Sequence, residues 1–324
     1  MVLAIRIHRT GGPECLQPDE VPLLAPERGE VQLRHTAIGV NFIDCYHRSG
    51  LYPVPLPAGI GSEAVGIVQA LGDGVTGIAV GDRVAYAGGM APGSYATARN
   101  VPAWRLVPVP AELDDVTLAA LLLKGLTAEC LVRRVFKVGP GHRVLVHAAA
   151  GGVGLLLCQW LRYIGTTVIG VVSSPAKAEL ARANGCHQVV VRGQEDVVAT
   201  VLSLTQQRGL DVVYDSVGQA TLRESLRCLR KRGLLVSFGN SSGRPEPLAL
   251  QELQAGSYFV TRPNLPDYTA TRQELVNAAA VLFERVRGGV LRARIDSTLP
   301  LAAAAEAHRR LESRQSAGAI VLVP

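Results

Sequence analysis

Hydrophobic and polar positions change their period near residue 118, and this change predicts two structural regions along the chain. Before it, short apolar or alternating runs such as Val31–Thr36, Ala64–Ala70 and Arg83–Tyr86 are separated by Gly- and Pro-rich turns. This pattern is typical of short β-strands. Beyond it, helical stretches alternate with short apolar runs, which favours a parallel, doubly wound sheet.

The elements of the second region and of the tail follow from the same periodicities. The predicted helices are Leu118–Val132, Leu155–Ile164, Ala176–Asn184, Glu195–Thr205 and Thr221–Leu229. The strands predicted between them are Arg143–His147, Thr167–Val172, Gln188–Val191, Val212–Asp215 and Gly233–Phe238. Past Gly256 the strict alternation is lost, and the tail predicts the strand Ser257–Thr261, the helix Arg272–Gly288, a strand near Arg294–Leu299, the helix Leu301–Arg314 and the strand Gly318–Val323.

We therefore predict an α/β protein with two domains, in which the tail returns to the first. Residues 1–122 and 264–324 form a discontinuous, β-rich catalytic domain, and residues 123–263 form a Rossmann nucleotide-binding domain with a doubly wound parallel sheet. The length agrees with this division, because 324 residues exceed the about 100–200 residues of a usual single domain.

Composition narrows the class of protein. A hydrophobic fraction of 48% with 19% charged residues predicts a folded, core-rich chain. No apolar run approaches the roughly 18–20 residues of a membrane span, and the N-terminus lacks the apolar core of a signal peptide. The six cysteines are scattered without a C-x-x-C pair, which argues against a zinc cluster or a disulfide framework. We expect a soluble, cytoplasmic protein that does not bind membranes.

The net charge of +6 leaves three interpretations of the basic residues. They are spread along the chain, with the densest clusters at Arg227–Arg232 and at His308, Arg309 and Arg310. We favour simple compositional bias, then recognition of a phosphorylated ligand, and last a nucleic-acid partner, which usually needs a clustered basic surface.

The most informative motif is a Gly-rich turn. The predicted strand ending at His147 runs into Ala-Ala-Ala-Gly-Gly-Val-Gly at residues 148–154 and then into a helix. Gly151 and Gly154 take the second and third places of the turn G-x-G-x-x-G, with Ala149 in the first. Gly151 lets the backbone approach a pyrophosphate, Gly154 lets the helix pack closely, and the helix N-terminus offers free N–H groups. The succession of strand, turn and helix predicts a dinucleotide site.

The end of the next strand indicates which dinucleotide binds. An NAD enzyme carries Asp or Glu about 20 residues beyond the glycines, where it bonds the ribose 2′-OH. This chain has Ser173, Ser174 and Lys177 there, and no carboxylate. Because hydroxyls and an ammonium can bind a 2′-phosphate, we predict NADPH. The alternative is that Lys177 is a solvated residue at the start of the next helix.

Short motifs along the whole chain occur together in one enzyme family. They lie at residues 39–44, 48–53, 59–63, 80–84, 123–128, 147–154, 215–218, 237–243, 261–263 and 311–314. In these motifs the chain resembles the medium-chain dehydrogenase/reductase superfamily, and within it the zinc-free quinone oxidoreductases related to zeta-crystallin. The resemblance implies a GroES-like fold for the first domain, a nicotinamide site in the cleft between the domains, and a homodimer in which Ser257–Thr261 pairs with its twin.

The resemblance also implies a set of cofactor contacts. They are Asn41, Phe42, Ile43, Asp44, Cys45, Tyr46, Cys130, Gly151, Gly152, Val153, Gly154, Ser173, Ser174, Lys177, Arg192, Ser216, Val217, Phe238, Gly239, Asn240, Ser241, Asn264, Leu265 and Arg314. Two positions depart from the relatives, which carry Tyr at Arg192 and a bulky residue at Cys130. Arg192 either binds the phosphate through a charge-assisted contact or faces solvent, and we favour the first. Arg314 is the second basic group that the resemblance brings to this phosphate.

The zinc ligands of related alcohol dehydrogenases are missing. Those enzymes place a Cys near the position of Asn41 and a His where this chain has Ser62, and they carry a lobe of four closely spaced cysteines that this chain lacks. Without a metal to stabilise an alkoxide, alcohol oxidation is disfavoured. A quinone accepts hydride readily, so that positioning carries most of the catalysis. We therefore predict metal-free, NADPH-dependent reduction of quinones.

Four residues are predicted to line the substrate site. Asn41 orients the cofactor or polarises a carbonyl, Tyr46 and Tyr52 stack on or hydrogen-bond to a flat substrate, and Thr127 lies near the nicotinamide. Tyr52 has an alternative as a surface-loop residue packed on prolines. We interpret His147 as a packed residue at a strand end, and no Ser-His-Asp set is found at motif positions.

The sequence is also compatible with two other functions. The first is an NADPH-dependent enone or enoyl reductase, which shares the hydride geometry and also needs a proton donor for the α-carbon. The second is a cofactor-regulated RNA-binding protein, because some zeta-crystallin relatives are proposed to bind RNA; the positive charge is compatible with this function without indicating it.

Overall fold

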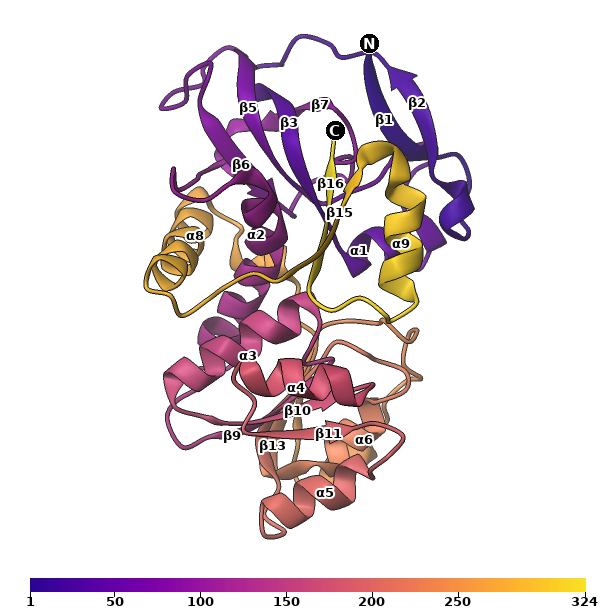
Figure 1. Ribbon diagram of the computed structural model, residues 1–324, viewed down its shortest axis with the longest axis vertical. Helices are drawn as coiled ribbons and strands as arrows, with labels where there is room; N and C mark the ends of the chain where they lie inside the picture. Colours follow the sequence, from indigo (N-terminus) through magenta and orange to yellow (C-terminus); the bar gives the residue numbers. More distant parts are fainter. The chain divides into compact units, whose positions relative to one another are not determined.

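The computed structural model describes residues 1–324 as two compact units. The first comprises Met1–Leu126, Tyr268–Phe283 and Ala293–Pro324, and the second Thr127–Asp267 and Glu284–Arg292. Among the helices, none combines the length and apolar character that crossing a bilayer requires. The predicted fold class is confirmed, since one unit is β-rich and the other is built on a parallel sheet (Figure 1).

The first unit contains two β-sheets. The larger has the order β15-β16-β3-β5-β6-β8, with β7 also paired to β3, and the smaller has the order β2-β1-β4. Its strands are β1 (Val2–Ile7), β2 (Gln17–Val21), β3 (Glu30–Val40), β4 (Ala58–Gly59), β5 (Glu63–Leu71), β6 (Arg83–Ala87), β7 (Ala98–Pro102), β8 (Val107–Pro108), β15 (Ile295–Pro300) and β16 (Ala319–Val323). The C-terminal strand β16 pairs antiparallel with β3, Ile320 lying opposite Val40.

Helices cover the strands of the first unit and supply part of its core. They are α1 (Phe42–Ser49), α9 (Ala304–Glu312) and most of α2 (Asp115–Cys130) and α8 (Arg272–Arg287), whose last residues belong to the second unit. The core joins buried residues of β1, β3, β5, β16 and α9, including Ile7, Leu33, Ile38 and Leu322. Alternate residues of β3 point into this core, because successive side chains of a strand face opposite sides.

The second unit holds a six-stranded, fully parallel sheet in the order β11-β10-β9-β12-β13-β14. Its strands are β9 (Arg143–His147), β10 (Thr167–Val172), β11 (Gln188–Val191), β12 (Leu210–Asp215), β13 (Leu229–Ser237) and β14 (Phe259–Thr261), and its helices are α3 (Gly152–Ile164), α4 (Pro175–Ala183), α5 (Val197–Leu204), α6 (Leu222–Arg227) and α7 (Leu250–Gln254). Strand order reverses between β9 and β12, the place where such sheets bind their ligands.

The predictions for the second unit agree closely with the structure. Strands β9, β10 and β11 have the predicted bounds. The predicted helices match α4 and α5 within one or two residues at each end, and the helix predicted from Leu155 ends with α3 at Ile164 but starts three residues late. The prediction for Thr221–Leu229 is wrong at its end, because α6 stops at Arg227 and Leu229 already begins β13. Two helices were not predicted, namely α1 and the short α7, and the first of them carries candidate site residues.

Candidate functional site

The predicted cofactor residues of the second unit follow the carboxyl ends of successive strands. The Gly turn follows β9, Ser173 to Lys177 follow β10, Arg192 follows β11, and Ser216 and Val217 follow β12. Phe238 to Ser241 come after β13, and Asn264 and Leu265 come shortly after β14. Because the strands are parallel, these segments all lie along one edge of the sheet, where open α/β sheets bind nucleotides.

The Gly turn has the close backbone packing that the motif requires. A Cβ built on Gly154 lies 2.2 Å from the carbonyl oxygen of Ala148, which no side chain can tolerate. Gly151 is the N-cap of α3, and no side chain caps this helix end. The first N–H groups of α3 therefore face the outside of the turn with the positive end of the helix dipole, a donor set suited to a pyrophosphate.

The groups after β10 and β11 are hydroxyls and cations. Ser174 caps α4, its Oγ accepting a hydrogen bond from the backbone N–H of Lys177 at 3.4 Å. Arg192 forms a two-pronged ion pair with Glu224, with nitrogen–oxygen distances of 2.5 and 3.3 Å. The Arg192 side chain stays 38% exposed. Glu224, a partner that the sequence did not indicate, neutralises part of its charge.

A buried carboxylate fixes the turn after β12. Asp215 Oδ1 accepts hydrogen bonds from the N–H groups of Val217 and Gly218 and from the hydroxyl of Thr221, at 2.8 to 3.1 Å. Its Oδ2 accepts from Ser225, whose Oγ lies 2.9 Å from His147 Nε2. The segment that carries Ser216 and Val217 is thereby held rigidly at the sheet edge.

His147 thus belongs to a Ser-His-Asp set that the motif positions did not indicate. All three side chains are at most 1% exposed. The pKa of His147 is lowered because burial disfavours its charged form. The Ser225 hydroxyl points its hydrogen at Asp215 rather than toward the imidazole, so the set links α6 to β9 and β12 and cannot generate an alkoxide nucleophile. This agrees with the interpretation of His147 as a packed residue.

Arg262 holds the end of β13 and the segment that follows it. Its guanidinium donates to the carbonyls of Ser237 and Gly239 at 3.2 and 3.0 Å, and Asn240 is 7% exposed beside it. Asn264 is exposed and donates to Asp267 at 3.3 Å.

Three predicted residues lie outside these segments. Cys130, at the end of α2, is 3% exposed, and burial raises its pKa to about 12. Thr127 is half-buried on the same helix, and Arg314 is an exposed residue after α9 with φ of 60°.

In the first unit, Asn41 lies in a cluster with a buried ion pair. Lys124 Nζ lies 2.9 Å from Asn41 Oδ1 and 3.2 Å from Glu63 Oε1. Asn41 Nδ2 donates to the same Glu63 oxygen at 2.8 Å and to the carbonyl of Gly39 at 3.3 Å. Both amide protons are used within the cluster, so the remaining capacity of this amide is that of an acceptor through Oδ1.

Sequence reasoning did not single out Lys124 and Glu63. Lys124 is 5% and Glu63 1% exposed, and Glu63 Oε2 also accepts the N–H of Leu123. The available signal was a single lysine in the otherwise apolar run 118–126, because a lone charge in a buried helix needs a partner. Gly39 is required here, since a Cβ on it lies 2.1 Å from Glu63 Oε1.

Helix α1 divides the other predicted residues between two sides. Phe42, Tyr46 and Tyr52 form an aromatic group in which Tyr46 and Tyr52 meet edge to face at 5.1 Å. Ile43 is half-buried near the start of the helix. Asp44 and Cys45 instead face the protein interior, with exposed fractions of 0% and 3%. Of the predicted substrate residues, Tyr46 and Tyr52 are brought together, and Asn41 caps the helix that carries Tyr46.

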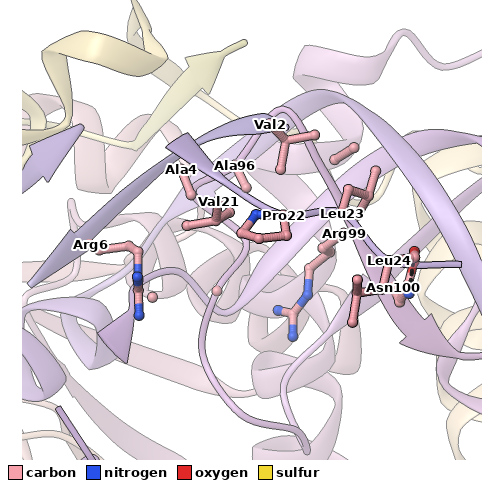
Figure 2. Close-up of a pocket in the computed structure, with 13 residues that line it drawn as sticks. Val2, Ala4, Arg6, Val21, Pro22, Leu23, Leu24, Ala96, Arg99 and Asn100 are labelled. Carbon is pink, nitrogen blue, oxygen red and sulfur yellow. Dashed lines mark hydrogen bonds between the residues drawn. The ribbon is translucent and has the colours of Figure 1, made fainter. Parts of the chain in front are cut away.

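Two further features of the structure bear on where ligands can bind. No group of three or more His, Cys, Asp and Glu side chains is arranged to hold a metal ion. An open cavity of about 530 Å³ lies in the first unit against β1, β2 and β7, with Arg6, Arg99 and Asn100 among apolar residues (Figure 2). Arg6 pairs with Asp19, and Arg99 donates to the carbonyl of Ala91. None of the predicted site residues lines this cavity.

Comparison with known proteins gives a consistent result along the whole chain. Residues 27–111 match the family "Alcohol dehydrogenase GroES-like domain" and residues 152–276 the family "Zinc-binding dehydrogenase". The chain is 45% identical to the 2-haloacrylate reductase of a Burkholderia species, covering 100% of this chain and 99% of that protein. It is also 45% identical to a quinone oxidoreductase of Pseudomonas aeruginosa, with 100% of both chains covered.

A solved structure is similar over the same length. The Escherichia coli quinone oxidoreductase complexed with NADPH superposes with a TM-score of 0.97 at 44% identity. The match covers 99% of this chain and 100% of that one. Fold and sequence therefore agree on the same group of relatives.

Proposed function

The chain belongs to the quinone oxidoreductase family of the medium-chain dehydrogenase/reductase superfamily, and we propose that it reduces quinones with NADPH by hydride transfer without a metal. The observation that carries the proposal is the carboxyl edge of the parallel sheet. There the Gly turn is followed by strand ends with hydroxyls and cations and no ribose-binding carboxylate, in a chain that matches quinone oxidoreductases over its full length.

The residues of the sheet edge fit NADPH. The Gly turn and the start of α3 would hold the pyrophosphate, and Ser173, Ser174 and Lys177 would hold the 2′-phosphate, with Arg192 and Arg314 as further cations. For Arg192 this requires exchange of its Glu224 partner for the phosphate. When bound, NADPH supplies the hydride. In this proposal residues 123–263 bind the cofactor and residues 1–122 and 264–324 bind the substrate.

The substrate side relies on positioning. Asn41, held by Lys124 and Glu63, orients the nicotinamide through Oδ1, and the aromatic group of Tyr46 and Tyr52 offers a face on which a flat quinone can stack. Thr127 completes this side. We propose zinc-free chemistry because Asn41 and Ser62 stand where related enzymes carry Cys and His, and neither side chain is a usual zinc ligand.

A second candidate function is reduction of an activated alkene, favoured by the 45% identity to a 2-haloacrylate reductase. One assay separates the two: NADPH oxidation with a panel of quinones, 2-enals and 2-haloacrylates. We expect turnover with quinones to exceed turnover with the alkenes, because quinones accept hydride with less assistance. Higher turnover with an alkene would contradict the first proposal and support the second.

The assembly we propose is a homodimer formed through β14. This strand lies at one end of the six-stranded sheet, and Phe259 and Val260 on it are 61% and 37% exposed. An exposed edge with apolar side chains favours pairing with a second chain. The six free cysteines, all buried, agree with a reducing compartment such as the cytoplasm.

A further inference from the structure

The buried carboxylate of Asp44 lies in a hydrogen-bonded chain within the first unit. Asp44 is 0% exposed, and its Oδ2 accepts from the backbone N–H of Asn41 at 2.8 Å and from the hydroxyl of Tyr95 at 3.1 Å. Its Oδ1 accepts from the hydroxyl of Ser62 at 2.6 Å. Ser62 is half-buried, so this series of hydrogen-bonded groups reaches accessible surface at the serine.

The positions of the hydrogens on Tyr95 and His308 follow from the contact between His308 and Arg48. Arg48 Nη1 lies 3.4 Å from His308 Nδ1, and a guanidinium only donates, so Nδ1 is an acceptor. The hydrogen of the neutral imidazole is then on Nε2, which lies 3.0 Å from the hydroxyl oxygen of Tyr95. Tyr95 receives this hydrogen bond and must point its own hydrogen at Asp44.

The two oxygens of Asp44 are therefore not equivalent. Oδ2 faces two donors whose direction is fixed, one from the backbone of Asn41 and one from Tyr95. Oδ1 faces only the Ser62 hydroxyl, and a hydroxyl can donate or accept. When Asp44 takes up a proton, it sits on Oδ1 and is donated to Ser62 Oγ. The Ser62 hydrogen is then free to turn away from Asp44.

The surroundings allow Asp44 to exist in both forms near neutral pH. Burial raises its pKa to about 7, with the Glu63 charge adding to the effect, while hydrogen bonds from Ser62, Asn41 and Tyr95 oppose it. The other charged groups around it form two ion pairs, Lys124 with Glu63 and Arg48 with Glu312. The remaining titratable neighbours are uncharged near neutral pH, because burial and Arg48 lower the pKa of His308 to about 3 and burial raises the pKa of Cys45.

We propose that Ser62 donates the proton that the reduced substrate requires, and that Asp44 stores this proton on Oδ1 and passes it to Ser62. The inference rests on the proposed function. Hydride addition leaves a hydroquinone with one anionic oxygen. The Ser62 O–H bond breaks as the product O–H bond forms, and the Asp44 O–H bond breaks as Ser62 is reprotonated. The buried Asp44 carboxylate then regains its proton from solvent through Ser62. One hydride and one proton are consumed, and no other redox partner is needed.

In this scheme Ser62 is the catalytic residue, and Asp44 and Tyr95 are positioning residues. Proton transfer from a positioned group contributes typically about 10²-fold or more to a rate. The position that carries a zinc-ligating His in related alcohol dehydrogenases would then carry a proton donor here. The Asn41 N–H and the Tyr95 hydroxyl occupy Oδ2 and so keep the Asp44 proton on Oδ1, the oxygen that faces Ser62.

The test compares Ser62→Ala, Ser62→Thr and Asp44→Asn with the wild type. Ser49→Ala is the matched control, because this serine is exposed and ends α1, the helix that carries Asp44. We expect the wild-type kcat with a quinone to fall above about pH 7 as Asp44 deprotonates. Ser62→Ala and Asp44→Asn should lower kcat about 10²-fold and abolish this pH limb. Ser62→Thr should restore both, and Ser49→Ala should change neither.

A readout without turnover separates this inference from the proposed function. Infrared difference spectra of the protein alone should show the carbonyl stretch of a protonated carboxyl that titrates near pH 7, present in Ser62→Ala and absent in Asp44→Asn. Wild-type quinone reduction with an unchanged rate and pH limb in Ser62→Ala would overturn the relay while the function stands. A wild type that reduces no quinone would overturn the function, whereas the infrared band would still report the Asp44 proton. If Asp44→Asn does not fold, the serine variants decide the question.

Discussion

Lys177 is the single residue whose predicted role is easiest to isolate. It lies in the first turn of α4, three residues after the N-cap Ser174, where the helix dipole already favours a phosphate. One charge-assisted hydrogen bond corresponds to about 1.5–3 kcal/mol. We expect Lys177→Ala to raise the KM for NADPH about tenfold and to leave the KM for NADH unchanged.

Lys231 provides the control for this measurement. It is exposed near the start of β13, at the amino ends of the parallel strands and away from the predicted cofactor site. Lys231→Ala should therefore leave the KM values for NADPH and NADH unchanged. Equal KM values for the two cofactors in the wild type, unaffected by Lys177→Ala, would show instead that Lys177 is a solvated residue.

Residues with local roles could be predicted from the sequence, whereas residues with distant partners could not. The Gly turn and the Ser174 cap on the Lys177 N–H form between neighbours a few positions apart, so the sequence pattern predicts their local structure. Arg192 pairs with Glu224, and Lys124 pairs with Glu63, across separations that no periodicity records. For these, the sequence indicated a charge without indicating its partner.

The turn between β9 and α3 is the element whose packing leaves least room for change. The Cβ of Gly154→Ala would meet the carbonyl oxygen of Ala148 at 2.2 Å, so the helix or the turn must shift. Overpacking of this kind costs typically about 1–3 kcal/mol. We expect a lower Tm and an NADPH affinity reduced at least about tenfold, because the N–H groups of α3 move from their positions.

Gly139→Ala is the matched control for this element. A Cβ there comes no closer than 4.0 Å to another residue, and Gly139 lies in the loop before β9. Differential scanning calorimetry and titration with NADPH should show little change. If Gly154→Ala bound NADPH as tightly as Gly139→Ala does, the turn would not be the pyrophosphate site.

Helix α1 shows why some elements escape prediction. Its inward face contains Asp44 and Arg48, which are 0% and 3% exposed, in place of the apolar stripe by which a helix is recognised. These charges are tolerated because Ser62, Tyr95 and Glu312 satisfy them from other parts of the unit. The strands β9, β10 and β11 were predicted with their bounds because each is a buried apolar run between clear turns.

At the scale of the whole molecule, the open question is what covers the edge strand β14. Only β13 pairs with it, so one row of its backbone groups lacks a strand partner within the chain. If two copies meet there across a two-fold axis, each residue of β14 faces the same strand of the other copy. We expect sedimentation at micromolar concentration to give the mass of a dimer.

Phe259→Asp tests this assembly because symmetry multiplies its effect. Two carboxylates brought together across the axis repel each other, and the exposed apolar ring that favours association is lost. We expect this variant to sediment as a monomer with an unchanged circular dichroism spectrum. Leu204→Asp, on the 42% exposed side chain at the end of α5, should remain dimeric. A wild type that sediments as a monomer at micromolar concentration would exclude β14 as a dimer interface. In that case β14 would have to be stable through its single pairing with β13, with its other edge open.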